Sequence, residues 1–319
     1  MIDYDAYDIE IDTRAARRER SRREPARAKV RPKHAQVASV ADGVEPGDDA
    51  AVGFMPTYKS ADNDHFEHQW IVSALGGFYD DKLIDDVRRA VKGGKEASVY
   101  LCEAHPSTGV DWIAAKIYRP RMFRSLKNDA LYREGREILD GSGKTIKARD
   151  KRMQRAVHQM TRFGQSLRIG SWIGHEYETL QLLHRAGVDI PRPFAAGENC
   201  ILMEFVGDID TAAPALNHVA LERDEAQPLF ERVLRNVEIM LSQHRIHADL
   251  SAYNILYWDG EIRIIDFPQA VDPRVNPHAE TLLARDVERV CQYFARFGVK
   301  TDAVTLARDL WSRYMRAEL

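Results

Sequence analysis

The sequence predicts an α+β fold with two lobes, one rich in β-strands and the other mostly helical. Two observations lead to this prediction. Short β-like segments separated by turns occur between residues 93 and 118, and further ones occur around residues 200 and 260. Long segments with apolar residues at helical spacing dominate from residue 228 to the end. Such an order builds two different lobes, and a ligand is expected to bind in the cleft between them.

The composition is that of an ordinary globular protein of one or two domains. The 319 residues are 44% hydrophobic and 30% charged. No apolar run approaches the ~20 residues of a membrane span, and ILMEFV at 201–206, which contains Glu204, is among the longest. The acidic start lacks the basic and then apolar pattern of a signal peptide. The cysteines Cys102, Cys200 and Cys291 form no CxxC pair, which favours reduced thiols. We therefore expect a cytoplasmic protein without membrane contact.

Residues 1–60 are predicted to form a disordered tail. Within it, residues 14–33 contain ten Arg or Lys against two Glu, and an acidic stretch follows at 42–50. Neither segment has the periodicity that forms a core. Two interpretations of the basic run remain open. It is either a solvated tail or an arm that binds RNA phosphates and releases their counterions.

The elements that follow the tail are predicted from periodicity and turn residues, with order beginning near Phe66. Apolar residues at helical spacing predict a helix over 80–91. A glycine pair leads into a strand over 93–102, and a second strand follows over 112–118. Residues 119–170 are basic, interrupted by glycine and poor in apolar periodicity. They are predicted to form a long loop or a partly helical insert.

The rest of the chain alternates helices with β-structure. Amphipathic periodicity, glycine and proline breaks, and an Asp-Gly turn between two short strands predict these elements. They are a helix over 172–187, a strand over 200–206, a helix over 228–246, a hairpin of strands 255–258 and 261–266, and helices over 278–297 and 302–317. The first lobe is then predicted to span residues 61–203 and the helical lobe residues 204–319.

The stretch HADLSAYNIL carries polar residues at a spacing that a simple turn does not need. Asp249 and Asn254 are five residues apart, and Asp266 ends the hairpin that follows. Upstream, Lys116 lies on a predicted strand and Glu176 on a predicted helix. This order of residue types, each on its own kind of element, matches the phosphoryl-transfer set of protein kinases.

Phosphoryl transfer needs these residue types because it depends mostly on positioning and on the neutralisation of charge. Asp249 is expected to orient the attacking hydroxyl or accept its proton. Asn254 and Asp266 offer the hard oxygens that Mg²⁺ prefers. Lys116 is expected to neutralise the α- and β-phosphates of ATP, and Glu176 to hold that lysine in place.

Four motifs make the chain similar to the RIO family of atypical protein kinases, most of all to its type-one branch. They are GKEASVY (94–100), AAKIY (114–118), HADLSAYNIL (247–256) and IIDFPQAV (264–271). The likeness covers roughly residues 80–300. The full GxGxxG set is missing, and only 53 residues follow Asp266. The resemblance therefore implies a two-lobed protein-kinase-like fold whose helical lobe lacks the peptide-binding subdomain.

The resemblance also implies an activity and its partners. The expected activity is that of an ATP-dependent serine/threonine protein kinase that uses Mg²⁺ or Mn²⁺ and autophosphorylates. The partners implied are ATP, a protein substrate or the chain itself, and ribosomal RNA or a pre-ribosomal particle. The basic tail and the basic insert would make the RNA contact.

The same framework assigns the residues that contact ATP, besides Lys116. The phosphate loop is expected to contribute Gly94, Lys95 and Ser98. The adenine site is expected to consist of Val99, Ala114 and Leu256 around the ring, Met203 at the back of the pocket, and the backbone of Glu204 and Val206 at the adenine edge.

Two other functions remain open at this point. An ATPase, or a nucleotide-switched module that binds RNA particles, would keep the same residues, and the missing peptide-binding subdomain favours it. A small-molecule phosphotransferase of the aminoglycoside type shares the HxDxxxxN loop and the aspartate that follows. The motifs GKEASVY and IDFPQAV fit that last family poorly.

Overall fold

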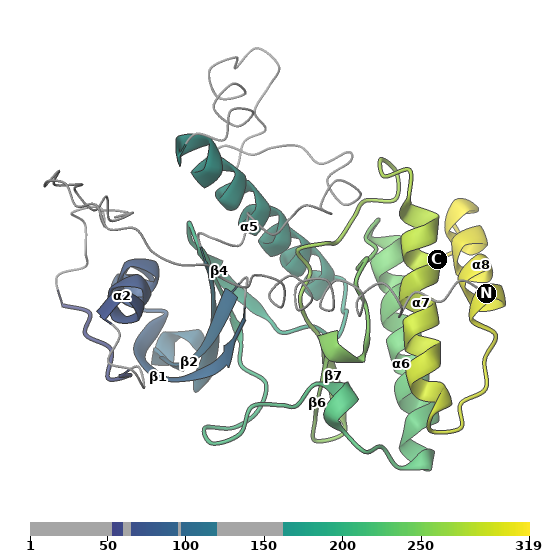
Figure 1. Ribbon diagram of the computed structural model, residues 1–319, viewed down its shortest axis with the longest axis horizontal. Coiled ribbons are helices and arrows are strands. Elements are labelled where there is room, and N and C mark those ends of the chain that lie inside the picture. The colour runs from purple at the N-terminus through teal and green to yellow at the C-terminus, as the bar shows by residue number, and fades with distance from the viewer. Residues whose placement is uncertain (1–52, 60–64, 95–96, 120–161) are drawn as a thin grey trace, which may run out of the picture. The chain divides into compact units, whose positions relative to one another are not determined.

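The structure is a computed structural model that describes residues 53–59, 65–94, 97–119 and 162–319 (Figure 1). All of these residues belong to one compact unit, residues 46–319. Most of the predicted tail and of the predicted basic insert lies outside the described residues, so both remain predictions.

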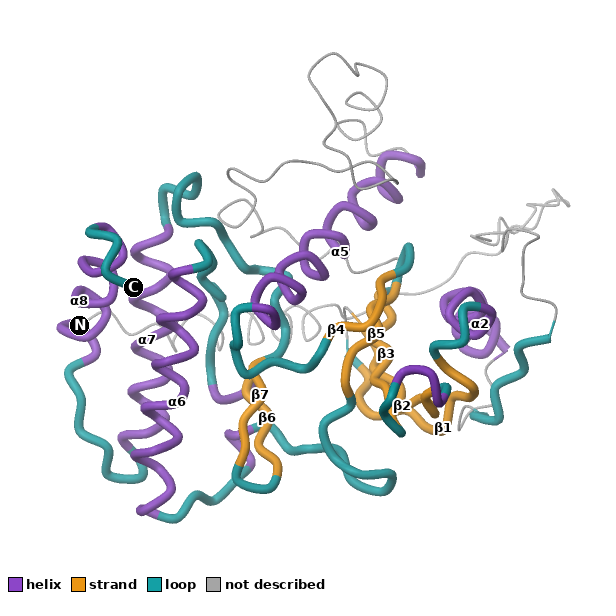
Figure 2. Tube along the Cα trace, turned by 180° about the vertical axis from the view of Figure 1, so that it is seen from behind, coloured by secondary structure: helices purple, strands orange, loops and turns teal. Residues whose placement is uncertain are grey.

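Five antiparallel strands form the sheet of the first lobe, in the spatial order β1-β2-β3-β5-β4 (Figure 2). The strands are β1 (Ile84–Gly93), β2 (Ala97–Ala104), β3 (Trp112–Tyr118), β4 (Pro193–Ala196) and β5 (Cys200–Glu204). The register places Val99 opposite Lys116 and Ala114 opposite Met203. Residues directly opposite each other point to the same side of a sheet, as do alternate residues of one strand, so these four side chains share one face.

Helix α2 (His65–Asp80) covers the other face of the sheet. Ile71 and Leu75 of α2 are buried in one hydrophobic cluster with Tyr100 and Cys102 of β2. The hydroxyl of Tyr100 also donates a hydrogen bond to Glu67 of α2, at 2.6 Å. The sheet therefore has one face closed by a helix and one face that carries Lys116.

The helix predicted over 80–91 is wrong, because α2 ends at Asp80 and this segment forms most of β1. Its helical spacing comes from a β-bulge, where the register against β2 shifts between Ile84 and Asp86. The extra residue allows Ile84 and Val87, three positions apart, to enter the same buried cluster. Apolar periodicity in a short segment does not separate a helix from a bulged strand.

Two smaller differences concern strand boundaries. The strand predicted over 93–102 begins at Ala97, because Gly93 ends β1. Strand β4 is an element that the sequence analysis does not predict, since it contains a proline and is only four residues long. As an edge strand it tolerates Pro193, which has no N–H to donate.

Among the described residues, four long helices and one hairpin follow strand β3. They are α5 (Arg162–Arg185), α6 (Arg223–Ser242), β6 (Ile255–Trp258), β7 (Glu261–Ile264), α7 (Ala279–Ala295) and α8 (Ala303–Met315). Short 3-10 helices lie at Pro106–Thr108, Leu216–His218 and Ala252–Asn254. The corresponding sequence predictions are confirmed as elements, although α5 and α6 both begin earlier than predicted and α6 ends at Ser242 rather than at residue 246.

The turn between β6 and β7 has the geometry that its sequence predicts. Asp259 has φ 49° and Gly260 has φ 77°. A type I′ turn requires positive φ at both central residues, and Asp-Gly is among the pairs that adopt it most readily. The hairpin places Asp266 just beyond the end of β7.

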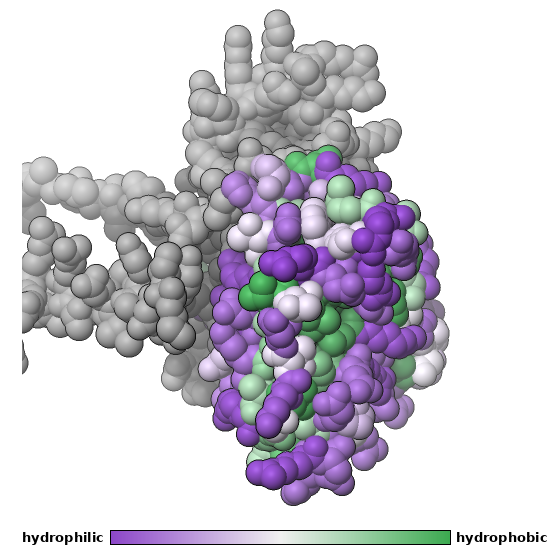
Figure 3. Space-filling model, turned by 90° about the vertical axis from the view of Figure 1, so that its right-hand side faces the viewer, coloured by the Kyte–Doolittle hydropathy of each residue, from purple (hydrophilic) through white to green (hydrophobic). Residues whose placement is uncertain are grey.

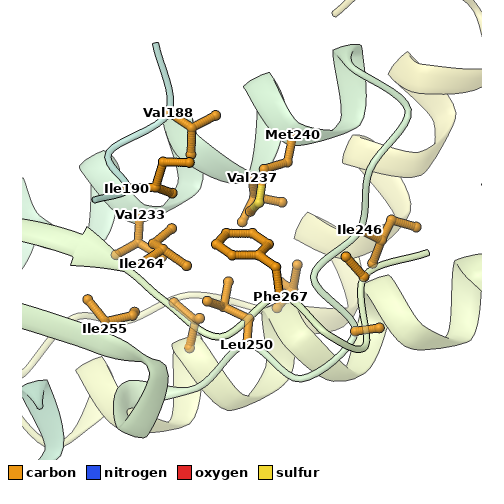
Figure 4. Packing of buried hydrophobic residues seen from close by; sticks show 14 of the residues in the cluster. Val188, Ile190, Val233, Val237, Met240, Ile246, Leu250, Ile255, Ile264 and Phe267 are labelled. Atoms are coloured by element: carbon orange, nitrogen blue, oxygen red, sulfur yellow. The ribbon is translucent and has the colours of Figure 1, made fainter. Parts of the chain in front are cut away.

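Phe267 is fully buried at the centre of the helical lobe (Figure 4). Its ring lies among Val188 and Ile190, which precede β4, and Val237 and Met240 of α6. Because Phe267 directly follows Asp266, the packing of this ring fixes the backbone from which the Asp266 side chain extends.

The surface on the side of α8 carries a band of hydrophobic residues between hydrophilic ones (Figure 3). Val304 and Met315 are exposed hydrophobic residues of α8. No helix among those described combines the length and the apolar character needed to cross a membrane.

Candidate active site

Lys116 joins three elements of the site through two ion pairs. Its Nζ lies 2.9 Å from Glu176 Oε1 and 2.7 Å from Asp266 Oδ1. Lys116 comes from β3, Glu176 from α5, and Asp266 from the loop after β7. Carboxylates 60 and 150 positions away in the sequence thus converge on one ammonium group. The structure brings together the lysine, the glutamate and the aspartate that the sequence pattern singled out.

Burial and charge act in opposite directions on this cluster. Desolvation favours a lower pKa for Lys116, but the carboxylates of Asp266 and Glu176 raise this pKa well above its usual value. Desolvation likewise favours a higher pKa for Asp266, but the charge of Lys116 lowers it below its usual value. Lys116 and Asp266 are therefore both charged at neutral pH.

Tyr118, on the same face of β3, contacts both members of the Lys116–Glu176 pair. Its hydroxyl donates a hydrogen bond to Glu176 Oε2, and Lys116 Nζ lies 5.2 Å from the centre of its ring. Trp172 of α5 packs edge-to-face on that ring at 5.6 Å. Each carboxylate oxygen of Glu176 is thus held by a different residue of β3.

Asp249 and Asn254 lie in the loop that joins α6 to β6. Asn254 Nδ2 donates to the backbone oxygen of Asp249 at 2.9 Å and lies 3.5 Å from its Oδ2. Arg289 Nη1 binds the other carboxylate oxygen, Oδ1, at 2.8 Å. The Asp249 side chain is 49% exposed, so a hydroxyl can approach it from solvent.

Helix α7 holds the backbone of this loop in an uncommon conformation. Ala248 has φ 66°, in the left-handed region that residues other than glycine rarely adopt. Buried Asp286 accepts hydrogen bonds from the amides of Ala248 (2.7 Å) and Leu250 (2.9 Å), and Arg285 donates to the carbonyl of Ala248. Burial raises the pKa of Asp286 to about 7, although the two amides lower it.

His247 ties the loop of Asp249 to the loop of Asp266. Its Nε2 lies 3.0 Å from the carbonyl of Ile265, and its ring lies 4.6 Å from the ring of Phe267. Burial lowers its pKa, so the imidazole is neutral at pH 7. Asp266 itself has φ 72°. This arrangement turns its side chain toward Lys116 while Phe267 enters the core.

The sheet face beside Lys116 holds three of the residues predicted to surround adenine. Val99, Ala114 and Met203 belong to one small hydrophobic cluster with Leu101. This cluster is distinct from the one that packs on α2. The fourth predicted neighbour is on another element: Leu256 is half-buried on β6.

The predicted phosphate loop lies between β1 and β2 and is described in part. The amide of Gly94 donates to the carbonyl of Ala97 at 2.9 Å, and a Cβ on Gly94 would meet that same oxygen at 2.9 Å. The turn therefore requires glycine at this position. Lys95 lies outside the described residues. Ser98 is buried and its hydroxyl accepts a hydrogen bond from Arg119, so a phosphate contact at Ser98 would compete with Arg119.

The predicted adenine edge follows β5. The amide of Glu204 donates to the carbonyl of Arg192 at 2.8 Å, and the carbonyl of Val206 accepts from the amide of Ala213 at 2.9 Å. An adenine base would therefore pair with the remaining groups, the Glu204 carbonyl and the Val206 amide.

Asn254 and Asp266 fit a magnesium ion by the chemistry of their donor atoms. Asn254 directs its Nδ2 toward Asp249, so its Oδ1 is the atom that would bind a cation. Asp266 binds Lys116 through Oδ1, and Oδ2 is its second donor. In the part of the chain that the structure describes, no three His, Cys, Asp or Glu side chains form a metal site by themselves. Phosphate oxygens and water would complete the coordination that Mg²⁺ prefers.

Comparison with known protein families identifies the chain. The family model described as RIO domain matches residues 138–307. The chain belongs to the RIO domain family. The matched region of this RIO domain includes Glu176, Asp249, Asn254 and Asp266, and Lys116 lies before it.

Curated relatives of this RIO domain carry kinase names. The chain is 35% identical over 237 residues to the RIO-type serine/threonine-protein kinase Rio1 of Haloferax volcanii, which covers 73% of this chain and 72% of the relative. It is 29% identical over 234 residues to the human serine/threonine-protein kinase RIO1, which covers 72% of this chain and 36% of the relative. The chain thus matches about three quarters of the archaeal relative and just over a third of the human one.

Solved structures share the fold of this RIO domain. The Rio2 kinase of Chaetomium thermophilum, in an ADP/Mg²⁺–phosphoaspartate complex, matches with a TM-score of 0.50 at 18% identity, over 84% of this chain and 77% of that one. The same kinase in a second structure also matches with a TM-score of 0.50, over 76% of this chain. The predicted two-lobed, kinase-like α+β fold is confirmed.

Three residues that the sequence does not single out hold the predicted site residues or the loop of Asp249 in place. They are Tyr118, Asp286 and Arg289. The sequence contains a feature that could have revealed Asp286, because this carboxylate lies among the buried apolar residues of an amphipathic helix, next to Val287. No comparable feature distinguishes Tyr118 and Arg289, since aromatic residues at strand ends and arginines on helices are common in any globular protein.

Proposed function

We propose that this RIO-family chain is an ATP-dependent serine/threonine-protein kinase. The observation that carries the proposal is the convergence of β3, α5 and the loop after β7 on Lys116. An ion pair between a strand lysine and a helix glutamate, together with an aspartate at a metal position, is what protein kinases need in place for transfer. The kinase names of the relatives support the same activity.

The proposed reaction transfers the γ-phosphoryl group of ATP to a serine or threonine hydroxyl. The hydroxyl oxygen forms a bond to the γ-phosphorus, while the bond from this phosphorus to the β–γ bridging oxygen breaks and leaves its electron pair on ADP. Asp249 accepts the hydroxyl proton and later releases it to solvent. Lys116 neutralises the α- and β-phosphates, and Glu176 holds Lys116 in place.

A divalent cation is part of this proposal. Asn254 and Asp266 would hold Mg²⁺, or Mn²⁺, against the phosphates, where the cation supplies charge neutralisation. The Chaetomium thermophilum Rio2 structure is a complex with ADP and Mg²⁺, which supports the choice of nucleotide and metal.

The test incubates radiolabelled ATP and Mg²⁺ with the purified protein, residues 1–319. It measures labelled protein and released phosphate in parallel. A kinase puts label on serine or threonine, either of the chain itself or of an added protein. The variant Asp249→Asn should lose this label. The matched control is Asp302→Asn, which keeps a good N-cap on α8 and lies outside the proposed site.

The two alternatives predict other results in the same experiment. Phosphate release without labelled protein would replace the kinase proposal with an ATPase or nucleotide-switched binding module. Transfer that occurs only when a small hydroxyl compound is added would indicate a small-molecule phosphotransferase. Labelled serine or threonine that survives Asp249→Asn would remove Asp249 from the proposed role.

We also propose that the basic segments bind RNA of a ribosomal or pre-ribosomal particle, in the cytoplasm. Residues 119–170 hold fourteen Arg or Lys against five Asp or Glu, and residues 14–33 add ten more. Binding of a structured RNA should weaken steeply with salt, because each neutralised phosphate releases counterions. Replacing the arginines of residues 14–33 by glutamine should reduce the salt dependence. Affinity that does not change with salt would contradict this proposal.

A further inference from the structure

We propose that Arg289 is a second cationic group of the phosphoryl-transfer site, placed on the side of the acceptor hydroxyl. In this role Arg289 holds the carboxylate of Asp249 and contacts the phosphoryl group as it moves from ATP to the hydroxyl. The inference rests on the proposed function, because it assigns Arg289 a part in that same transfer.

The first observation is the contact itself. Arg289 Nη1 lies 2.8 Å from Asp249 Oδ1. The amide of Asn254 lies near the other carboxylate oxygen, Oδ2, at 3.5 Å. The carboxylate of the proposed base is thus held from two sides, by a cation on Oδ1 and by a neutral donor on Oδ2.

The second observation is the rigid support of Arg289. Helix α7 contacts the loop of Asp249 through successive turns: Arg285 and Asp286 bind the backbone of Ala248 and Leu250, and Arg289 binds the Asp249 side chain. Residues four apart lie on the same face of a helix. One helix therefore supports both the loop and the backbone from which the Arg289 side chain extends.

The third observation argues against a purely structural role. The side chains of Arg289 and Asp249 are 40% and 49% exposed. Ion pairs with this degree of exposure contribute little to stability, because water screens them and two long side chains must be ordered. A contact that adds little to stability, made to the one carboxylate proposed as base, fits a role in catalysis.

Charge distribution gives Arg289 its function. Lys116 is shared between Glu176 and Asp266, so this trio carries one formal positive and two formal negative charges, and Asp249 adds a third negative charge. The trio faces the nucleotide and its metal ion. Negative charge that develops on the transferred group near Asp249 needs a cation of its own, and Arg289 is the cation that the structure pairs with Asp249.

The distances allow direct contact with the phosphoryl group. A base takes a hydroxyl proton at about 2.6–3.2 Å, and the reacting atoms of a near-attack geometry stand about 3–3.5 Å apart. The γ-phosphorus therefore comes within about 6 Å of the Asp249 carboxylate at transfer. The guanidinium of Arg289 already touches this carboxylate and has further N–H donors in a planar fork. These further donors are the atoms proposed to contact the phosphoryl oxygens while Nη1 stays on Asp249.

The test compares Arg289→Gln and Arg289→Lys with wild type and with a matched control, Arg313→Gln. Arg313 forms a partly exposed ion pair with Glu238 between α8 and α6, and neither residue is assigned to the site. The measurements are kcat and KM for phosphotransfer, the affinity for Mg·ADP with and without aluminium fluoride, and the thermal unfolding midpoint. Aluminium fluoride with Mg·ADP mimics the phosphoryl group in transfer.

We expect Arg289→Gln to lower kcat by at least ~10²-fold, the size of effect seen when one stabilising donor is removed from a transition state. KM for ATP and the affinity for Mg·ADP alone should stay within about threefold, whereas the extra affinity that aluminium fluoride provides should be lost. The kcat of Arg289→Lys should lie between those of wild type and Arg289→Gln, since lysine keeps the positive charge but loses the planar set of N–H donors. A further variant, Arg289→Ala, removes the guanidinium and leaves space for a free guanidinium ion, so added guanidinium should restore part of its activity.

Other outcomes would overturn the inference. If the wild-type chain transfers phosphate and the kcat of Arg289→Gln stays within about threefold of the wild-type kcat, Arg289 takes no part in the transfer. An equal loss of affinity for Mg·ADP with and without aluminium fluoride, together with a lower unfolding midpoint, shows a structural role instead. No transfer by the wild-type chain itself would instead overturn the proposed function, and this inference with it.

Discussion

Glu176 shows how single side chains set the geometry of this site. Its two carboxylate oxygens bind two residues of one strand, Oε1 to Lys116 and Oε2 to Tyr118. Both carboxylate oxygens are therefore bound, and the Lys116 that Glu176 holds also binds Asp266. At this scale the chemistry of the site depends on which atoms are already paired.

Tyr118→Phe tests this pairing. The variant loses the hydrogen bond to Glu176, a bond to a charged group that is worth roughly 1.5–3 kcal/mol, so Lys116 should be less well held and turnover should fall about tenfold. The matched control is Tyr100→Phe, which removes a hydrogen bond to Glu67 on the other face of the same sheet. It should lower the free energy of unfolding but leave turnover near wild type. Equal turnover of the two variants would contradict a role of Tyr118 in the site.

The aspartates of the site should separate in their effects on nucleotide affinity. Asp249→Ala should abolish transfer and leave the affinity for Mg·ATP nearly intact, because Asp249 acts on the hydroxyl. Asp266→Ala should weaken metal-dependent binding, and Lys116→Ala should cut turnover by at least ~10²-fold through lost charge stabilisation. Calorimetric titration with Mg·ATP measures the affinities. The same loss of affinity in Asp249→Ala and Asp266→Ala would remove this division of roles.

Helix α7 acts as one unit on the loop that carries Asp249. Asp286 satisfies two amides of the loop, and Arg285 satisfies a carbonyl. The strained backbone of Ala248 persists because these contacts hold it. At the scale of elements, the loop gains its shape from a helix that begins about thirty residues later in the sequence.

The raised pKa of Asp286 predicts how stability depends on pH. Its folded-state pKa is raised from 3.8 to about 7 by burial, so the contribution of this group is fully present below about pH 4 and is lost as the pH rises through 7. In Asp286→Asn, which cannot ionise, the free energy of unfolding should fall less between pH 5 and 8 than in wild type. One proton accounts for at most about 1.4 kcal/mol per pH unit. Denaturant unfolding at several pH values measures this, and identical slopes in both proteins would contradict the prediction.

In the molecule as a whole, the hydrophobic core holds the backbone that carries Asp266 in place. Phe267 packs among residues from α6, from the hairpin and from the segment before β4 (Figure 4). The adjacent Asp266 therefore reaches Lys116 from a backbone that the core holds still. Of these two adjacent residues, Phe267 contributes to the stability of the fold and Asp266 to the geometry of the site.

Phe267→Ala should lower the free energy of unfolding by about 3–5 kcal/mol, because it removes a buried ring and leaves a cavity. Metal-dependent nucleotide binding should fall as well, since Asp266 loses its fixed backbone. The comparison variant is Met315→Ala on exposed α8 surface, which should change stability by no more than about 0.5 kcal/mol. Denaturant unfolding measures both, and an effect of Phe267→Ala as small as that of Met315→Ala would contradict the central place of this ring.

Local sequence determined much of this protein. The Asp-Gly hairpin, the long helices and strand β3 are predicted from turn chemistry and periodicity, because these signals act over a few residues. Lys116, Glu176, Asp249, Asn254 and Asp266 are found because their types and spacing are characteristic of one chemistry. That these five residues come together in space was expected from the kinase-like fold that the family resemblance implied.

Tertiary structure alone decided the rest. Ile84 and Val87 have helical spacing and still lie on a strand, because a bulge and pairing with β2 override the local pattern. Ser98 is covered by Arg119, a contact that no motif announces. The pairing of Asp249 with Arg289 joins residues 40 positions apart. Such contacts depend on how α7 packs against the loop, and packing is a property of the whole fold, which no short stretch of sequence contains.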